Sequence, residues 1–334
     1  MNTRQFWVDH FAPPAPELQK TFVALTPPDC AEILEAIGAP QAVGTQYESP
    51  ENRVFGFGEV VLKIYRPGRW SRAALQEEVQ FLEDLRDADV PFVRPIGGLG
   101  TWRGLHYLAY EAVPGPFDVD PKTLDEASVR ELVHLAARLH DVGAKRAAPN
   151  RPTFDPGAMC AGCFDVIRSA GFLPTAQQGR YGAAIDRIVA QLAALGEIPV
   201  QRIHGDLYSG NALWRPQGPV LMDLDDFQVG PVALDLSLLS SSWRLDTLPA
   251  ALDRAERRAV QHRLVLDLYR EVRPFPSEWE PLVPLVRGCR AVEFDAWLSS
   301  RWKEPGFAEH YDQDDMTDPD WWRESVEGLE RATG

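Results

Sequence analysis

In the first third of the chain, some hydrophobic positions have the spacing of a β-strand and others have the spacing of a helix. Phe55 and Phe57 lead through Gly58 into the β-branched run 60–65, which predicts two strands joined by a turn. Ser71 can cap a helix that has an apolar stripe along one side. The elements expected here are strands near 54–57, 60–65, 90–96 and 106–110, and helices over 30–37 and 71–87.

Beyond a linker at 113–116, which carries two prolines and a glycine, the helical period dominates. We expect a mainly helical C-terminal lobe over 113–334 and a small sheet-containing N-terminal lobe over 1–112. Residues 1–28, rich in proline and aromatic residues, would form a loosely packed leader. The expected C-terminal elements are helices over 123–140, 181–195, 234–244, 254–271 and 279–302, a last helix in the tail, and short strands at 200–203 and 220–222.

Composition narrows the class of protein. The 334 residues are 45% hydrophobic and 25% charged, which is typical of a globular chain. A net charge of -15 without a basic stripe argues against a nucleic-acid partner. Cys160 and Cys163 form a C-x-x-C, but no second pair exists, so we expect reduced thiols and not a zinc site. Without a signal-like start or a membrane-length apolar stretch, we expect a cytoplasmic protein with no membrane partner.

One segment carries the strongest chemical signal. Residues 203–211 read Ile-His-Gly-Asp-Leu-Tyr-Ser-Gly-Asn, and an apolar strand then delivers Asp223. Phosphoryl transfer needs a carboxylate that orients the attacking hydroxyl, and oxygen ligands that hold Mg²⁺ against the phosphates. We therefore predict Asp206 as the catalytic base and Asn211 with Asp223 as ligands of Mg²⁺, with ATP as the phosphoryl donor. His204 is better placed to brace the loop than to titrate.

The same residues resemble a known group of enzymes. A His-Gly-Asp with Asn five residues after the Asp, followed by a strand ending in Asp, is similar to the aminoglycoside phosphotransferase and choline kinase group; protein kinases carry Arg where Gly205 stands. The segments 51–55, 61–70, 230–236 and 296–302 resemble the bacterial stress response kinase A family, over about residues 30 to 330. This resemblance implies an α+β, bilobal, protein-kinase-like fold.

The resemblance also implies roles for residues of the N-terminal lobe. Lys63 stands where the family contacts the α- and β-phosphates, and Glu78 is its expected partner, with Glu77 as the alternative. Glu111 and Val113 match the hinge, whose backbone would bind the adenine edge. The G-x-G-x-x-G of protein kinases is absent, so Ser49 and backbone amides near Glu51 and Asn52 would cover the phosphates.

Two further aspartates are expected to support the site. Asp235 follows Gly230-Pro231 at a helix start, where the family's matching Asp braces the catalytic loop; an ordinary helix cap is the other interpretation. Asp225 would assist Asp223, which we count as catalytic together with Asp206.

The resemblance implies a function: an ATP- and Mg²⁺-dependent Ser/Thr protein kinase of the stress response. Such an enzyme would phosphorylate a protein substrate and itself, and we expect it to be a monomer. The alternative is a small-molecule kinase for an aminoglycoside, a homoserine-like compound or an amino alcohol, which the acidic balance would suit. A nucleotide-binding pseudoenzyme is a third possibility, against which the intact set of Lys63, Asp206, Asn211 and Asp223 argues.

Overall fold

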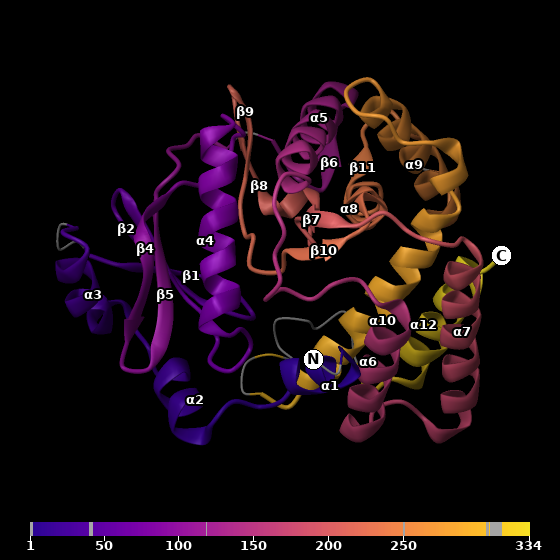
Figure 1. The fold of residues 1–334 in the computed structure, drawn as a ribbon, viewed down its shortest axis with the longest axis horizontal. Helices are drawn as coiled ribbons and strands as arrows, with labels where there is room; N and C mark the ends of the chain where they lie inside the picture. The colour runs from indigo at the N-terminus through magenta and orange to yellow at the C-terminus, as the bar shows by residue number, and fades with distance from the viewer. Residues whose placement is uncertain (1–2, 40–42, 118, 250, 305–306, 308–315) are drawn as a thin grey trace. The chain divides into compact units, whose positions relative to one another are not determined.

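The computed structural model describes residues 3–39, 43–117, 119–249, 251–304, 307 and 316–334. It divides into two compact units (Figure 1). The first, called the helical unit below, comprises residues 1–13, 152–200 and 276–334. The second, called the catalytic unit, comprises 14–151 and 201–275. The predicted boundary between lobes near residue 112 falls within the catalytic unit and stays a prediction.

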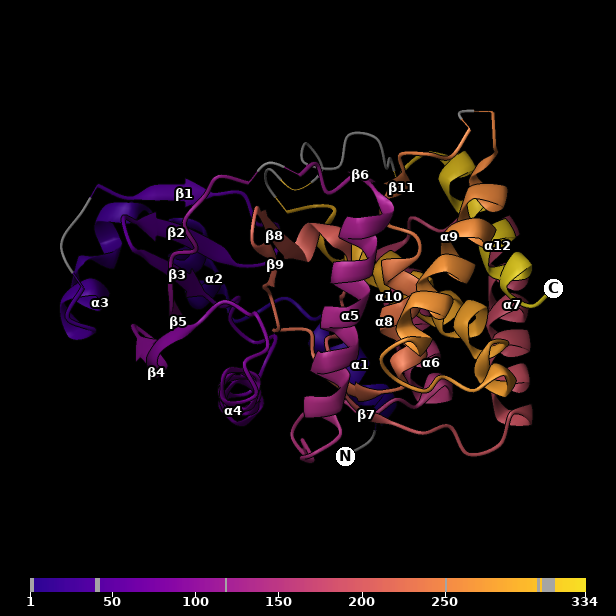
Figure 2. The same cartoon turned by 90° about the horizontal axis from the view of Figure 1, so that it is seen from above.

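A five-stranded antiparallel sheet opens the catalytic unit. Its strand order is β1-β2-β3-β5-β4, and Figure 2 shows the first four strands following one another in that order. The pleat places Leu62 and Ile64 on one face and Lys63 on the other, because successive side chains of a strand alternate. The strands are β1 Thr45–Tyr47, β2 Arg53–Phe57, β3 Val60–Ile64, β4 Pro95–Trp102 and β5 Leu105–Glu111.

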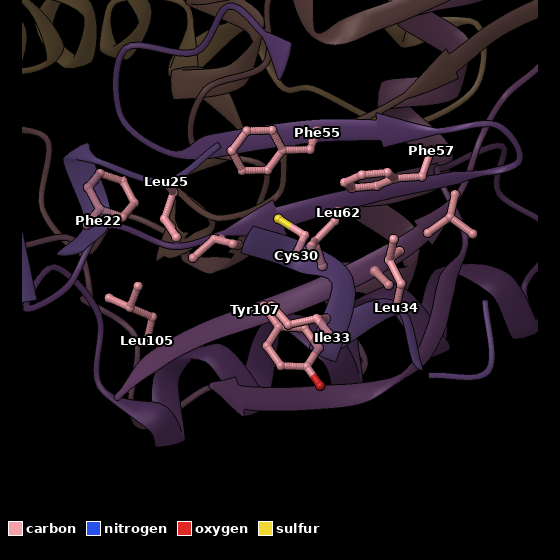
Figure 3. Packing of buried hydrophobic residues seen from close by; sticks show 13 residues of the cluster. Phe22, Leu25, Cys30, Ile33, Leu34, Phe55, Phe57, Leu62, Leu105 and Tyr107 are labelled. Atoms are coloured by element: carbon pink, nitrogen blue, oxygen red, sulfur yellow. The ribbon is translucent and has the colours of Figure 1, made fainter. Parts of the chain in front are cut away.

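The apolar face of this sheet packs against a short helix. Helix α3, Ala31–Ala36, contributes Ile33 and Leu34, each 1% exposed, to a cluster with Phe55 and Leu62 (Figure 3). The opposite face carries Lys63, and α4, Arg72–Asp87, lies on that side (Figure 1). Burying the first face therefore fixes the direction in which Lys63 points.

The start of the chain is not a loose leader, so that expectation is wrong. Helix α1, Thr3–His10, buries Trp7 within the helical unit, and Phe11 follows at 4% exposed. Helix α2, Pro16–Val23, buries Phe22 in the sheet core of the catalytic unit. The aromatic residues that made the segment look irregular hold it in place, because their burial removes a large apolar surface from water.

The strand predicted at 90–96 is displaced along the chain. The ladder strand is β4, which begins only at Pro95. Residues before it pair elsewhere: Val93 N donates to Leu221 O at 2.9 Å, and Leu221 N donates to Pro91 O at 3.0 Å. Because Pro91 has no N–H of its own, it can serve only as an acceptor, which suits this short bridge.

The rest of the chain is mainly helical, as predicted, so the α+β class is confirmed. Helix α6 was not expected; its glycines and alanines blur the apolar stripe. No helix among the described residues is long and apolar enough to cross a membrane. The remaining elements are η1 Pro27–Cys30, β6 Thr123–Leu124, α5 Glu126–Gly143, α6 Pro156–Ala170, α7 Thr175–Ala194, β7 Gln201–Ile203, η2 Ser209–Asn211, β8 Ala212–Arg215, β9 Gly218–Leu221, β10 Gln228–Gly230, α8 Val232–Leu239, β11 Arg244–Leu245, α9 Arg254–Arg270, η3 Ser277–Trp279, α10 Leu282–Arg301 and α12 Pro319–Ala332.

Candidate active site

The segment between β7 and β8 folds around the predicted base. The side-chain Nδ2 of Asn211 donates to the Asp206 carbonyl oxygen at 2.9 Å and to its Oδ2 at 3.2 Å. An amide whose nitrogen is used in this way directs its oxygen elsewhere, so Oδ1 of Asn211 is the atom left for a cation. The structure therefore brings the predicted base and one predicted metal ligand into direct contact.

A buried carboxylate holds the backbone of the loop that carries Asp206. Asp235, in the first turn of α8, accepts hydrogen bonds from the backbone N–H groups of His204 and Gly205, both at 2.9 Å. Its Oδ2 also lies 3.0 Å from Nε2 of His140, whose pKa burial lowers, so that the neutral ring donates to Asp235. Both carboxylate oxygens of Asp235 are thus in use, as a bracing role requires.

The loop is also joined to the segment that carries Asp223. Nε2 of His204 donates to the carbonyl oxygen of Met222 at 3.0 Å. Gly205 has φ +83°, and a Cβ there would overlap the carbonyl oxygen of Asp226. Only glycine fits this position, because other residues disfavour a positive φ and would bring the clashing atom.

Lys63 has different partners from those expected. Its Nζ lies 2.5 Å from Oδ1 of Asp223 and 2.8 Å from Oδ1 of Asp225. The expected ion pair with Glu78, or alternatively Glu77, is wrong. Glu78 instead accepts from Arg151 at 3.2 Å, and Glu77 accepts from Nδ2 of Asn150 at 2.7 Å.

Asp225 is the central anion of the site and not merely a helper of Asp223. Its carboxylate, 4% exposed, accepts from Lys63, from Nη1 of Arg69 at 3.2 Å and from Nδ2 of Asn52 at 3.0 Å. Burial opposes its charge, but Lys63, a hydrogen bond with Asp223 and Arg69 together outweigh that cost, and the pKa of Asp225 lies well below the usual range. Asp225 is therefore the permanently ionised member of the pair that shares Lys63.

Asp223 differs from Asp225 in exposure and backbone. Its side chain is 44% exposed, and its φ is +63°, a conformation that costs a non-glycine residue about 1–3 kcal/mol. Desolvation and the neighbouring charge of Asp225 raise its pKa well above the usual range, while Lys63 acts in the opposite direction. This is the carboxylate of the pair that a solvent-borne cation can reach.

The stretch expected to cover the phosphates lies beside the ion network of the site. Glu51 and Asn52 are 7% and 5% exposed, and Glu51 pairs with Nε of Arg66 at 3.0 Å. Their side chains point into the ion network and not toward a ligand. Ser49 is only partly buried, and its hydroxyl oxygen accepts from Asn52 N at 3.2 Å, which leaves its O–H to donate. The roles of Ser49 and of the nearby backbone amides in covering the phosphates stay predictions.

The expected hinge lies beside a cavity of about 350 Å³. Glu111, Ala112 and Val113 line it together with residues 89–95 and Arg215. None of Lys63, Asp206, Asn211 and Asp223 is among the described residues that line this cavity. The hinge contact with adenine therefore stays a prediction for Glu111 and Val113.

The residues fit a divalent cation that is shared with phosphate groups. The described part of the chain has no cluster of three or more His, Cys, Asp or Glu that could hold a metal alone. Mg²⁺ in kinases is bound by one or two protein oxygens together with substrate phosphates, so a small protein set is what the chemistry requires. Asn211 and Asp223 lie close along the ladder, since Met222 N donates to Asn211 O at 3.0 Å.

Sequence reasoning missed three contributors: Arg69, Asn52 and Arg151. The first two lie in the segments 51–55 and 61–70, which carried the resemblance but received no ionic role. Basic residues that follow shortly after a strand with a buried lysine are the signal that could have found Arg69. Arg151 lies in a proline-rich stretch without a periodic pattern, so nothing in the sequence marked it.

Comparisons with known proteins agree on one enzyme family. The model of the phosphotransferase enzyme family matches residues 50–275. Serine/threonine protein kinase RdoA of Salmonella typhimurium is 31% identical over 316 residues, covering 91% of this chain and 91% of that protein. Stress response kinase A of Escherichia coli is 30% identical over 326 residues, covering 93% and 94%.

A solved structure shows the same fold at lower identity. The amicoumacin kinase hAmiN, in complex with AMP-PNP, Ca²⁺ and Ami, has a TM-score of 0.69 at 16% identity, covering 89% of this chain and 92% of that one. The protein-kinase-like fold predicted from the sequence is thereby confirmed. In that neighbour, the fold binds AMP-PNP and Ca²⁺.

Proposed function

Since the chain belongs to the stress response kinase A family, within the phosphotransferase enzyme family, we propose that it is a Ser/Thr protein kinase that uses ATP and Mg²⁺. The observation that carries the proposal is the contact of Lys63 with Asp223 and Asp225, 160 and 162 residues along the chain. This contact supports the proposal, because phosphoryl transfer needs a cation for the phosphates near a carboxylate for the metal.

Each residue has one task in the proposed reaction. Asp206 accepts the proton of a substrate Ser or Thr hydroxyl while the oxygen of that hydroxyl forms a bond to the γ-phosphorus. The bond from that phosphorus to the β,γ-bridging oxygen breaks, and ADP leaves. Asn211 and Asp223 would hold Mg²⁺, which neutralises charge on the phosphates, and Lys63 would contact the α- and β-phosphates. Ser49 and the backbone at Glu111 and Val113 would bind the rest of the nucleotide.

Compartment and assembly form part of the same proposal. All four cysteines are free and buried, which supports a reducing compartment such as the cytoplasm. We propose that the enzyme acts there as a monomer and phosphorylates itself, which size-exclusion chromatography and mass spectrometry would test.

A small-molecule acceptor is the second candidate, and the net charge of -15 favours it, since a cationic amine would be attracted. The deciding experiment incubates the protein with γ-labelled ATP and Mg²⁺, alone, with general protein substrates, and with aminoglycosides and amino alcohols. Label on Ser or Thr of protein, absent with Asp206→Asn, is the expected result. Label that appears only on a small molecule would overturn the protein-kinase proposal.

A further inference from the structure

Arg151 is a buried cation inside the catalytic unit that the reaction itself does not use. It lies in the segment between α5 and α6 and is 3% exposed. Its guanidinium lies over two aromatic rings, 4.4 Å from the centre of Trp70 and 4.1 Å from that of Phe227. Two such contacts limit the orientations that the guanidinium group can take.

The edge of the guanidinium makes hydrogen bonds to two structural elements. On α4, Nε donates to the carbonyl oxygen of Ala74 at 3.0 Å, and Nη2 donates to Oε2 of Glu78 at 3.2 Å. On the segment after β9, Nη1 donates to the carbonyl oxygen of Asp225 at 2.5 Å. One rigid fork thus ties the helix to the segment that carries the metal ligand Asp223.

The pair between Arg151 and Glu78 also decides which carboxylates Lys63 contacts. Glu78 is fully buried, and its remaining contacts include the hydroxyl of Tyr65 at 2.8 Å. Burial raises the pKa of Glu78 while Lys63 and Arg151 lower it, so the charge of Glu78 already acts on Lys63 from nearby. Without Arg151, Lys63 would be the nearest cation left for that carboxylate.

We propose that Arg151 is a positioning residue for the metal and phosphate site. It holds the backbone of Asp225, two residues from Asp223, and it neutralises Glu78 so that Lys63 stays with Asp223 and Asp225. The inference rests on the proposed function, because it concerns the binding of Mg²⁺ and nucleotide. Arg151 is in contact with neither the reacting hydroxyl nor the base, so it acts through Asp225 and Glu78.

The test compares Arg151→Met with a matched control in the same unit. Arg202 is 2% exposed, lies 4.3 Å from the centre of the Phe81 ring, and donates to the carbonyl oxygens of Val142 and Gly143 at 3.2 and 3.3 Å. It is thus a buried arginine with the same kinds of contact but none to Asp225. Arg202→Met measures what the loss of such an arginine does to stability alone.

The main readout is the Mg²⁺ concentration for half-maximal binding of a fluorescent ATP analogue, which needs no turnover. For Arg151→Met we expect it to rise about 10- to 100-fold, as for other residues that orient metal ligands, and to stay unchanged for Arg202→Met. Arg151→Lys should not restore it, since an ammonium group cannot donate to three separated acceptors in one plane.

The double variant Arg151→Met/Glu78→Gln keeps the test decisive if Arg151→Met fails to fold, since removing both charges of a buried pair is far less destabilising than removing one. Compared with Glu78→Gln alone, it should still need more Mg²⁺, because the bond to Asp225 is gone. An unchanged Mg²⁺ requirement in a folded Arg151 variant would overturn the inference and leave Arg151 a stability residue. A wild type that binds no nucleotide with Mg²⁺ would overturn the proposed function as well.

Discussion

Buried acids of the two units differ in the partners that they have. In the catalytic unit, some buried acids are paired with cations, as Asp225 is with Lys63 and Arg69. In the helical unit, Asp295 is 3% exposed, and its partners are the hydroxyls of Tyr181 at 2.7 Å and Ser325 at 2.5 Å. Hydroxyl donors do not cancel the cost of burying a charge, and desolvation raises the pKa of Asp295 to about 6.

The thiols of the helical unit show the same neutral behaviour. Burial raises the pKa of Cys163 well above its usual range, and a hydrogen bond with Cys160 does the same for Cys289. Such thiols are poor nucleophiles and poor metal ligands, because both kinds of chemistry use the thiolate. Burial thus favours the neutral forms of Asp295 and these thiols, whereas in the catalytic unit Lys63 and Arg69 favour the charged form of Asp225.

Replacing the base should give the largest effect. Asp206→Asn removes the proton acceptor but keeps the size and polarity of the side chain, so we expect the rate of phosphoryl transfer to fall by about 10²–10⁴. Nucleotide binding should change little. Single-turnover kinetics with labelled ATP measures the first and a fluorescent analogue the second. Near-normal turnover would assign the base to another carboxylate, with Asp223 the first to examine.

The metal ligands should be unequal in effect. Asp223→Ala removes a carboxylate, which binds Mg²⁺ in its charged form, whereas Asn211→Ala removes a neutral amide, so Asp223→Ala should raise the Mg²⁺ requirement more. We expect its effect to exceed the about 10- to 100-fold typical of residues that only orient ligands. A titration of Mg²⁺ at fixed ATP measures both variants. Equal Mg²⁺ dependence in wild type and Asp223→Ala would remove Asp223 from the metal site.

Breaking the ion network should cost stability as well as activity. Asp225→Ala leaves Lys63 and Arg69 buried with fewer partners, and we expect the free energy of unfolding to fall by about 3–5 kcal/mol. The control is Asp87→Asn, whose partner Arg86 is half exposed, with an expected loss below about 1 kcal/mol. Urea denaturation followed by tryptophan fluorescence compares them. Similar losses for both variants would mean that the buried network contributes no more to stability than an exposed ion pair does.

A substitution in the helical unit should have the smallest effect on stability, and this effect should depend most on pH. The pKa of Asp295 is about 6 in the folded chain against 3.8 as its ordinary value, so the folded state binds the extra proton between these limits. Its contribution is complete below about pH 4 and is lost as the pH rises through 6, a change of about 3 kcal/mol at most. Asp295→Asn should remove that pH dependence.

Urea denaturation at several pH values between 4 and 8 measures this slope. The exposed Asp186, on α7 of the same unit, supplies the control Asp186→Asn, which should keep the wild-type slope. A slope that persists in Asp295→Asn would show that another group accounts for it.

The sequence predicted the parts of the site that are contiguous in the chain. Asp206 and Asn211 are five residues apart, and their contact follows from one short loop, so the motif alone located them. The strand that carries Lys63 was also predicted, because its residues are β-branched and its neighbours are turn formers.

The partners of Lys63 could not be predicted, because they depend on contacts between residues that lie far apart in the sequence. Glu78 is occupied by Arg151, 73 residues further along, which frees Lys63 for Asp223 and Asp225. A local pattern holds no information about such a competition between charges. The same limit explains the start of the chain, where Trp7 and Phe22 find apolar neighbours that only the folded structure supplies.

The conformation at Gly205 restricts which residues this chain can accept there. Protein kinases carry Arg at the corresponding place, yet here any side chain would meet the carbonyl oxygen of Asp226 and would need a left-handed backbone. A change from Gly to Arg at this position would therefore require the segment after Asp223 to move as well. In this chain, a single substitution is thus not enough to exchange one kind of catalytic loop for the other.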